Sequence, residues 1–214
     1  MTITYPRPLI DNAAMAECWF DLAEPVIMQA SAKGQLINLS QVNDPVWRGT
    51  FQTGILERDK QSIWSAWRKS LRGTKTFIAY DVRKSTPRAY PNATSAASIS
   101  GAWDGMAVVS SVGLSGALGL TGLPASYQFK IGDRVGLEQS GKYGYYEILE
   151  DVTASGGGAA TINVAPFLHT TLFNTSAVCR VWRPVCQFLI DQATWAEQGT
   201  VEKTPIAFNG VQRL

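Results

Sequence analysis

The chain has 214 residues, of which 45% are hydrophobic and 17% are charged, and its formal net charge is +2. This length allows one sizeable domain or two small ones, and the apolar content suits a globular protein with a real core. A charge so close to zero, with both signs mixed along the chain, argues against a specific nucleic-acid-binding protein and against wholesale disorder.

The N-terminal part predicts an extended arm followed by two paired strands. Residues 1–18 contain Pro6 and Pro8 and predict the arm. A strand is expected from Trp19 to about residue 29, broken at Pro25, and a turn at residues 33–35 leads to a partner strand over 35–39. The residues before Ile10 lack a basic region followed by an apolar core, so we expect no secretion signal.

Residues 47–82 predict a strand, a helix and a second strand, over 47–56, 59–72 and 75–82. In the first strand, alternate residues mark one face: Trp47, Gly49, Phe51 and Thr53. In the helix, Asp59 is the expected N-cap and Gly73 the expected stop. Residues at helical spacing predict an apolar side that docks on a sheet: Ile63, Trp64, Trp67 and Leu71.

The remainder predicts a β insert and a return to the sheet. Residues 83–92 are rich in Pro, Ser, Thr and basic residues and predict a connector. Short strands with turns over 93–183, including a tight turn at Gly132-Asp133 and a flexible tip at 156–158, favour a small barrel of the SH3 or OB kind. A central strand over 186–191 and a last strand over 201–211 follow, ending near the turn signal Asn209-Gly210.

One uncharged segment requires a test for membrane insertion. Residues 105–129 carry no charge and are long enough to cross a bilayer. Five glycines and Pro124 dilute the segment, however, and its short apolar pairs predict strands and turns. We therefore expect no membrane span.

The chain offers few groups for catalysis or for metal binding. Its three cysteines, Cys18, Cys179 and Cys186, lack Cys-x-x-Cys spacing, and its one histidine, His169, has no evident partner. A structural zinc site needs about four ligands, so we expect no metal or other cofactor, buried free thiols and a structural or surface role for His169. Nucleophile-elbow, phosphate-loop and dinucleotide-binding motifs are absent from the sequence.

Three other groups of residues are candidates for functional sites. Glu147, Glu150 and Asp151 could serve a glycosidase, but the pattern favours surface charge. Aromatic residues of the insert could stack on a sugar, although a core or interface role is favoured: Trp103, Tyr143, Tyr145 and Tyr146. A basic group near the helix end favours interaction with the helix dipole over phosphate binding: Arg68, Lys69 and Arg72. We assign no catalytic, cofactor-binding or metal residue, and expect no enzyme.

The order of several motifs resembles that of a known family. The motifs are Val46-Trp-Arg-Gly-Thr-Phe, Trp67-Arg-Lys-Ser-Leu-Arg-Gly, Thr76-Phe-Ile-Ala-Tyr-Asp, Leu118-Gly-Leu-Thr-Gly-Leu-Pro-Ala, Ile131-Gly-Asp-Arg-Val, Ala160-Thr-Ile-Asn-Val-Ala-Pro and Arg183-Pro-Val-Cys-Gln-Phe-Leu. In this order they resemble the distal tail (Dit-like) proteins of long-tailed bacteriophages, over about residues 19–208. The extended N-terminal arm and the tyrosines at 143–146 have no match in that pattern.

The resemblance implies a mainly β fold with one packed helix, in which residues 19–92 plus 184–214 form a tail-tube-like β-sandwich and residues 93–183 an inserted small barrel. It implies a structural ring, commonly hexameric, at the distal end of the virion tail, assembled in the bacterial cytoplasm. The expected partners are other copies, the tail tube protein, hub or tip proteins, and fibres or the tape measure. Two alternatives are a carbohydrate-binding or receptor-adhesion module and, less favoured, a wall-degrading hydrolase.

Overall fold

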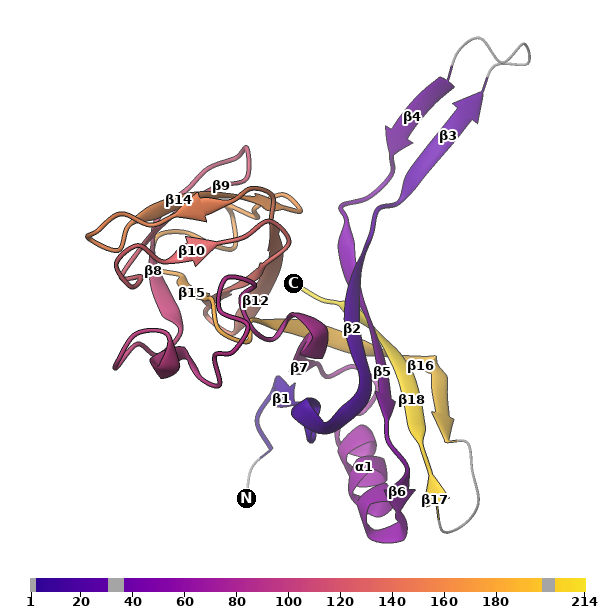
Figure 1. The fold of residues 1–214 in the computed structure, drawn as a ribbon. Helices are drawn as coiled ribbons and strands as arrows, with labels where there is room; N and C mark the ends of the chain where they lie inside the picture. Colours follow the sequence, from indigo (N-terminus) through magenta and orange to yellow (C-terminus); the bar gives the residue numbers. More distant parts are fainter. Residues whose placement is uncertain (1–2, 31–36, 198–202) are drawn as a thin grey trace.

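The computed structural model describes residues 3–30, 37–197 and 203–214 (Figure 1). Within them the chain is mainly β, with one α-helix, α1 (Arg58–Ser70), and three 3-10 turns, η1 (Asn12–Ala14), η2 (Val82–Lys84) and η3 (Ala96–Ser98). It contains a six-stranded sheet and a closed six-stranded barrel. The prediction of a mainly β fold with one packed helix and a small barrel is confirmed.

The six-stranded sheet, called here the main sheet, is antiparallel except where its first two strands pair. Its order is β1 (Arg7–Pro8), β7 (Phe77–Tyr80), β16 (Val185–Glu197), β18 (Ile206–Gln212), β5 (Val46–Thr53) and β2 (Met15–Ala23). Helix α1 supplies the layer that packs against it. Short strands β6 (Leu56–Glu57) and β17 (Lys203–Thr204) pair beside α1.

The barrel is inserted between two adjacent strands of the main sheet. The chain leaves after β7 and returns in β16, where Val185 pairs with Tyr80. The barrel order is β11 (Arg134–Gln139), β12 (Lys142–Ile148), β14 (Ala160–Ala165), β9 (Ala117–Thr121), β8 (Met106–Val112) and β15 (Val178–Arg180). A small pair, β10 (Gln128–Phe129) and β13 (Val152–Thr153), lies beside it. These strands fall inside the predicted insert 93–183.

Two-residue alternation puts one face of the main sheet in the core. In β5, the predicted inward residues Trp47, Gly49, Phe51 and Thr53 are all buried. The ring of Phe51 stacks on Phe208 of β18, with centroids 5.0 Å apart, and meets Phe188 of β16 edge-on at 5.5 Å. A Cβ atom at position 49 would lie 2.6 Å from the Phe51 ring, so this close packing requires glycine.

Helix α1 docks through a narrower stripe than the sequence predicts. Trp64, Trp67 and Leu71 are buried, whereas Ile63 is 56% exposed. Trp64, Trp67 and Leu71 lie along one side of the helix. Ile63 is rotated by 100° from Trp64 about the helix axis and lies outside that stripe. The predicted N-cap is wrong: Glu57 occupies that position without a side-chain bond, and Asp59 lies in the first turn, where its charge favours the dipole. Arg72 and Gly73 turn left-handed and end the helix.

Three further expectations differ from the structure. The predicted arm 1–18 belongs to the body, because β1 pairs with β7 and β2 already starts at Met15. Asn209-Gly210 lies inside β18, where both residues pair with β5, and makes no turn. The segment 156–158, predicted to be a flexible tip, is packed against the chain. Gly158 lies so close to Leu123 that a Cβ atom there would be 2.0 Å from the Leu123 carbonyl oxygen. The predicted turn at residues 33–35 lies outside the described residues.

Candidate assembly surface

The three acidic candidates, Glu147, Glu150 and Asp151, do not face one another. Glu147 pairs with Arg134 of the neighbouring strand β11. Glu150 accepts a bond from Asn163 at 2.5 Å, and Asp151 lies 2.8 Å from the Lys130 ammonium. Each carboxylate therefore has a different partner, and these contacts do not form the facing pair that glycoside hydrolysis needs.

His169 and the insert aromatics Trp103, Tyr145 and Tyr146 have structural roles within the chain. The carbonyl of His169 accepts bonds from the backbone N–H groups of Leu172 and Phe173, both at 2.9 Å. Tyr145 and Tyr146 are each 1% exposed, and the half-buried Trp103 donates to the carbonyl of Met106 at 2.7 Å. The favoured core role is confirmed for Tyr145 and Tyr146, and the buried Tyr145 ring is not available to stack on a sugar.

Arg68, Lys69 and Arg72 do not form one basic cluster, because α1 ends between Lys69 and Arg72. The Arg68 guanidinium lies 4.6 Å from the centre of the Trp195 ring and 3.3 Å from the Gln192 side-chain oxygen. Lys69 shares the last turn with Arg68, whereas Arg72 lies beyond it in a left-handed conformation. Arg68 is thus held against β16.

All three cysteines are buried free thiols, as predicted. Burial raises the pKa of the Cys18 thiol and of the Cys179 thiol to about 12, and it raises the pKa of Cys186 as well. Among residues 3–30, 37–197 and 203–214, no group of three His, Cys, Asp or Glu side chains is placed to hold a metal ion. In the same part of the chain, no helix has the length and apolar character needed to cross a membrane.

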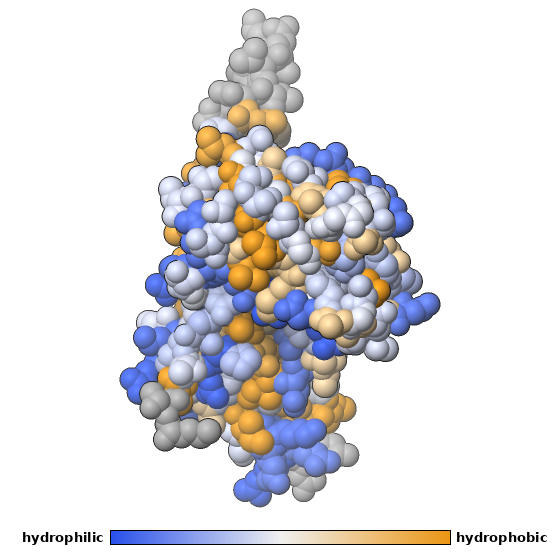
Figure 2. All heavy atoms as spheres, turned by 90° about the vertical axis from the view of Figure 1, so that its left-hand side faces the viewer, coloured by the Kyte–Doolittle hydropathy of each residue, from blue (hydrophilic) through white to orange (hydrophobic). Residues whose placement is uncertain are grey.

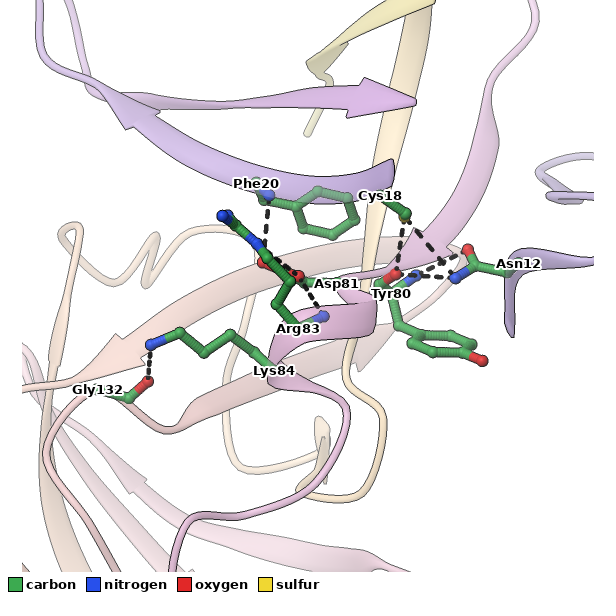
Figure 3. Close-up of polar contacts among 8 residues, drawn as sticks. All are labelled: Asn12, Cys18, Phe20, Tyr80, Asp81, Arg83, Lys84 and Gly132. Atoms are coloured by element: carbon green, nitrogen blue, oxygen red, sulfur yellow. Dashed lines mark hydrogen bonds and ion pairs between the residues drawn. The ribbon is translucent and has the colours of Figure 1, made fainter. Parts of the chain in front are cut away.

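A buried polar clasp joins two distant strands of the main sheet (Figure 3). The carboxylate of Asp81, only 1% exposed, accepts the backbone N–H of Phe20 in β2 at 3.2 Å and that of Arg83 at 2.9 Å. Beside it, the Asn12 amide and the Cys18 thiol both donate to the Tyr80 carbonyl, at 2.9 and 3.3 Å. The sheet therefore curls until β2, at one end of its order, meets the end of β7.

A second set of contacts fixes the barrel on the main sheet. The indole N–H of Trp47 donates to the Tyr145 carbonyl at 2.7 Å, and the Arg134 guanidinium lies 4.4 Å above the Trp47 ring. The Tyr145 side chain belongs to the core of the main sheet although its strand, β12, belongs to the barrel. From the connector, Lys84 donates to the Gly132 carbonyl at 3.0 Å. These buried contacts hold the two parts in one orientation.

The two-stranded ribbon of β3 (Val26–Ala30) and β4 (Ile37–Gln41) extends away from both parts (Figure 1). Within the described chain its strands pair only with each other. The register places Val26, Met28 and Leu39 on one face, and they are 49%, 65% and 65% exposed. A lone two-stranded ribbon is at best marginally stable in water. This apolar face therefore needs a cover that the described chain does not supply.

The apolar face continues into a groove between the ribbon and one end of the barrel. The groove has a volume of about 320 Å³ and is bounded by Val26 and Gln41 on the ribbon side. Its barrel side is formed by residues around the ends of β12 and β14: Leu149, Val164, Ala165, Pro166 and Phe167. Hydrophobic side chains form a column below the ribbon on this side of the molecule (Figure 2). We call the ribbon face and this groove together the apolar angle.

No family model matches the sequence, and the comparison with curated proteins finds no match. The apolar angle was not predicted from the sequence, although the alternation of residues 26–28 and 39–41 gives the two faces of the ribbon once their pairing is known. Val26 and the barrel residue Phe167, 141 positions later, line the same groove, and no local sequence pattern predicts that they come together.

Proposed function

We propose that the chain is a structural subunit of a bacteriophage tail, and that copies of it form a ring, expected to be hexameric, at the distal end of the tail. The ring joins the tail tube to the hub, tip proteins or fibres. The proposal combines the motif order described above with one structural observation, the exposed apolar angle.

The apolar angle supports assembly because isolated soluble proteins rarely expose a contiguous apolar surface of this kind. The ribbon holds Met28 and Leu39 away from the body, where a neighbouring chain can reach them. A contact between such a projecting element and a different surface of the next copy closes into a ring when the rotation fits. A subunit of a conduit needs these contacts and needs no reacting group.

The edges of the main sheet are poorly suited to assembly. Strand β1 at one edge has two residues, and in β2 at the other edge the N–H of Phe20 is already bonded to Asp81. The barrel is closed and has no edge. Assembly of this chain is therefore expected through side-chain surfaces.

The same proposal names the expected partners of the protein and its location in the virion. The tail tube protein and hub or tip proteins stack on the two ends of the ring, and fibres or the tape measure are further contacts. Assembly takes place in the bacterial cytoplasm before the subunit enters the virion. The net charge of +2 suits a lumen through which DNA passes without tight binding.

Electron microscopy of the purified protein, together with antibody labelling of virions, tests this function. We expect rings in the purified sample and label at the tail tip. Absence of rings combined with absence of label from virions contradicts the proposal. Binding of the isolated protein on a glycan array, without rings, supports the adhesion alternative.

A further inference from the structure

The barrel carries an uncharged outer wall. Residues 105–129, which contain β8 and β9, have no charged side chain. On the wall, Val178 of β15 pairs with Val108 of β8, and Val108 pairs with Thr121 of β9. Val108 is 58% exposed and Val178 is 38% exposed. Arg180, in the same strand as Val178, is paired within the chain, because its guanidinium lies 2.5 Å from the Glu138 carboxylate.

The apolar angle is also almost free of charge. Glu24 is the charged residue among those that line its groove, and the described ribbon residues 26–28 and 39–41 carry none. Away from Glu24, charged groups on a covering surface would lose their hydration without finding partners. We therefore expect the occupant of the angle to be largely uncharged, as the wall is.

The length of the ribbon is sufficient to cover the width of the wall. Five residues of β3 extend over roughly 17 Å, and three neighbouring strands are about 10 Å across, so the Val178–Val108–Thr121 row fits within the length of the ribbon. The wall stands on a closed barrel, whose fixed backbone lowers the entropic cost of the association.

We propose that the apolar angle of one copy receives the outer wall of the barrel, at Val108 and Val178, of a second copy. One chain cannot make this contact itself, because the barrel is held on the main sheet by Trp47, Tyr145 and Arg134, and residues 164–167 of the same barrel line the groove. The contact joins two different surfaces and is therefore heterologous, the type that generates rings. The inference rests on the proposed function, since it names the surfaces through which the copies meet.

Two variants, each damaging one surface, test the contact. Leu39→Asp places a charge in the angle, and Val108→Asp places one on the wall; both positions are exposed, so folding is retained and is checked by circular dichroism. Each variant alone is expected to be monomeric by light scattering. An equimolar mixture contains one intact angle and one intact wall, and is expected to give a dimer of twice 23.3 kDa. Ile63→Asp, at an exposed position on α1, is the control and is expected to assemble like the wild type.

The outcomes separate this contact from the function it serves. If the wild type forms rings and either single variant also does so, the assigned surfaces are wrong while the ring proposal stands. If both variants are monomeric and their mixture stays monomeric, the angle and the wall do not meet each other, and the inference is overturned. A wild type that is monomeric at every concentration overturns the ring itself.

Discussion

Aromatic residues fill the space between α1 and the main sheet. Trp67 is 2% exposed, donates to the Pro8 carbonyl at 3.1 Å and meets the rings of Trp64 and Phe77 edge-on. Its indole thereby connects the helix, the first strand and the centre of the sheet.

Truncation of this side chain leaves a large cavity. Trp67→Ala is expected to lower the free energy of unfolding by about 3–5 kcal/mol, measured by urea denaturation. Ile63→Ala, on the exposed side of the same helix, is the matched control and is expected to change it by less than about 0.5 kcal/mol. A loss below about 1 kcal/mol for Trp67→Ala contradicts the assignment of the buried face.

The buried thiols give the protein a predictable response to alkaline pH. Desolvation raises the pKa of Cys18 and of Cys179 from 9.0 to about 12, so the folded state keeps protons that the unfolded state releases. Stability is therefore complete below about pH 9 and falls as the pH rises toward 12. Burial of Tyr127 raises its pKa and acts in the same direction.

Thiol labelling checks this expectation. At pH 8 the native protein should react with an aromatic disulfide reagent only after urea is added, and the urea midpoint should fall between pH 8 and pH 10. Rapid labelling of the native protein, or a midpoint that rises over this interval, contradicts the burial of the thiols.

Among the elements, β2 is joined to the end of β7 by the Asp81 carboxylate and by the bond from the Cys18 thiol to the Tyr80 carbonyl. Asp81→Ala leaves the backbone N–H groups of Phe20 and Arg83 without their acceptor. The N–H of Phe20 is buried, and a buried group without a partner costs about 1–3 kcal/mol, whereas the N–H of Arg83 is only partly buried. We expect a loss in that range by urea denaturation, a smaller loss for Asp81→Asn, which keeps one acceptor oxygen, and almost none for the exposed Asp44→Ala. Equal stability of all three variants contradicts the clasp.

The elements that the sequence predicts well are those set by local periodicity. The spacing of Trp64, Trp67 and Leu71 identifies α1, and the alternation of Trp47, Gly49, Phe51 and Thr53 identifies β5. Long-range contacts have no such signal. The bond from Phe20 to Asp81 spans 61 positions, and Tyr145 enters the core of a sheet to which its strand does not belong.

At the scale of the whole molecule, the barrel, the main sheet and the ribbon have fixed relative positions that create the apolar angle. Neither the ribbon nor the barrel alone forms the groove, because its lining comes from both. Composition and local periodicity therefore predict the fold class, whereas the surface proposed for assembly emerges only from the tertiary arrangement.

Light scattering of the purified chain over a series of concentrations tests self-assembly most directly. The account predicts a species of six times 23.3 kDa for the wild type and for Ile63→Asp, and loss of that species for Met28→Asp, whose charge lies on the apolar face of the ribbon. A wild type that keeps the mass of a single chain at all concentrations contradicts it.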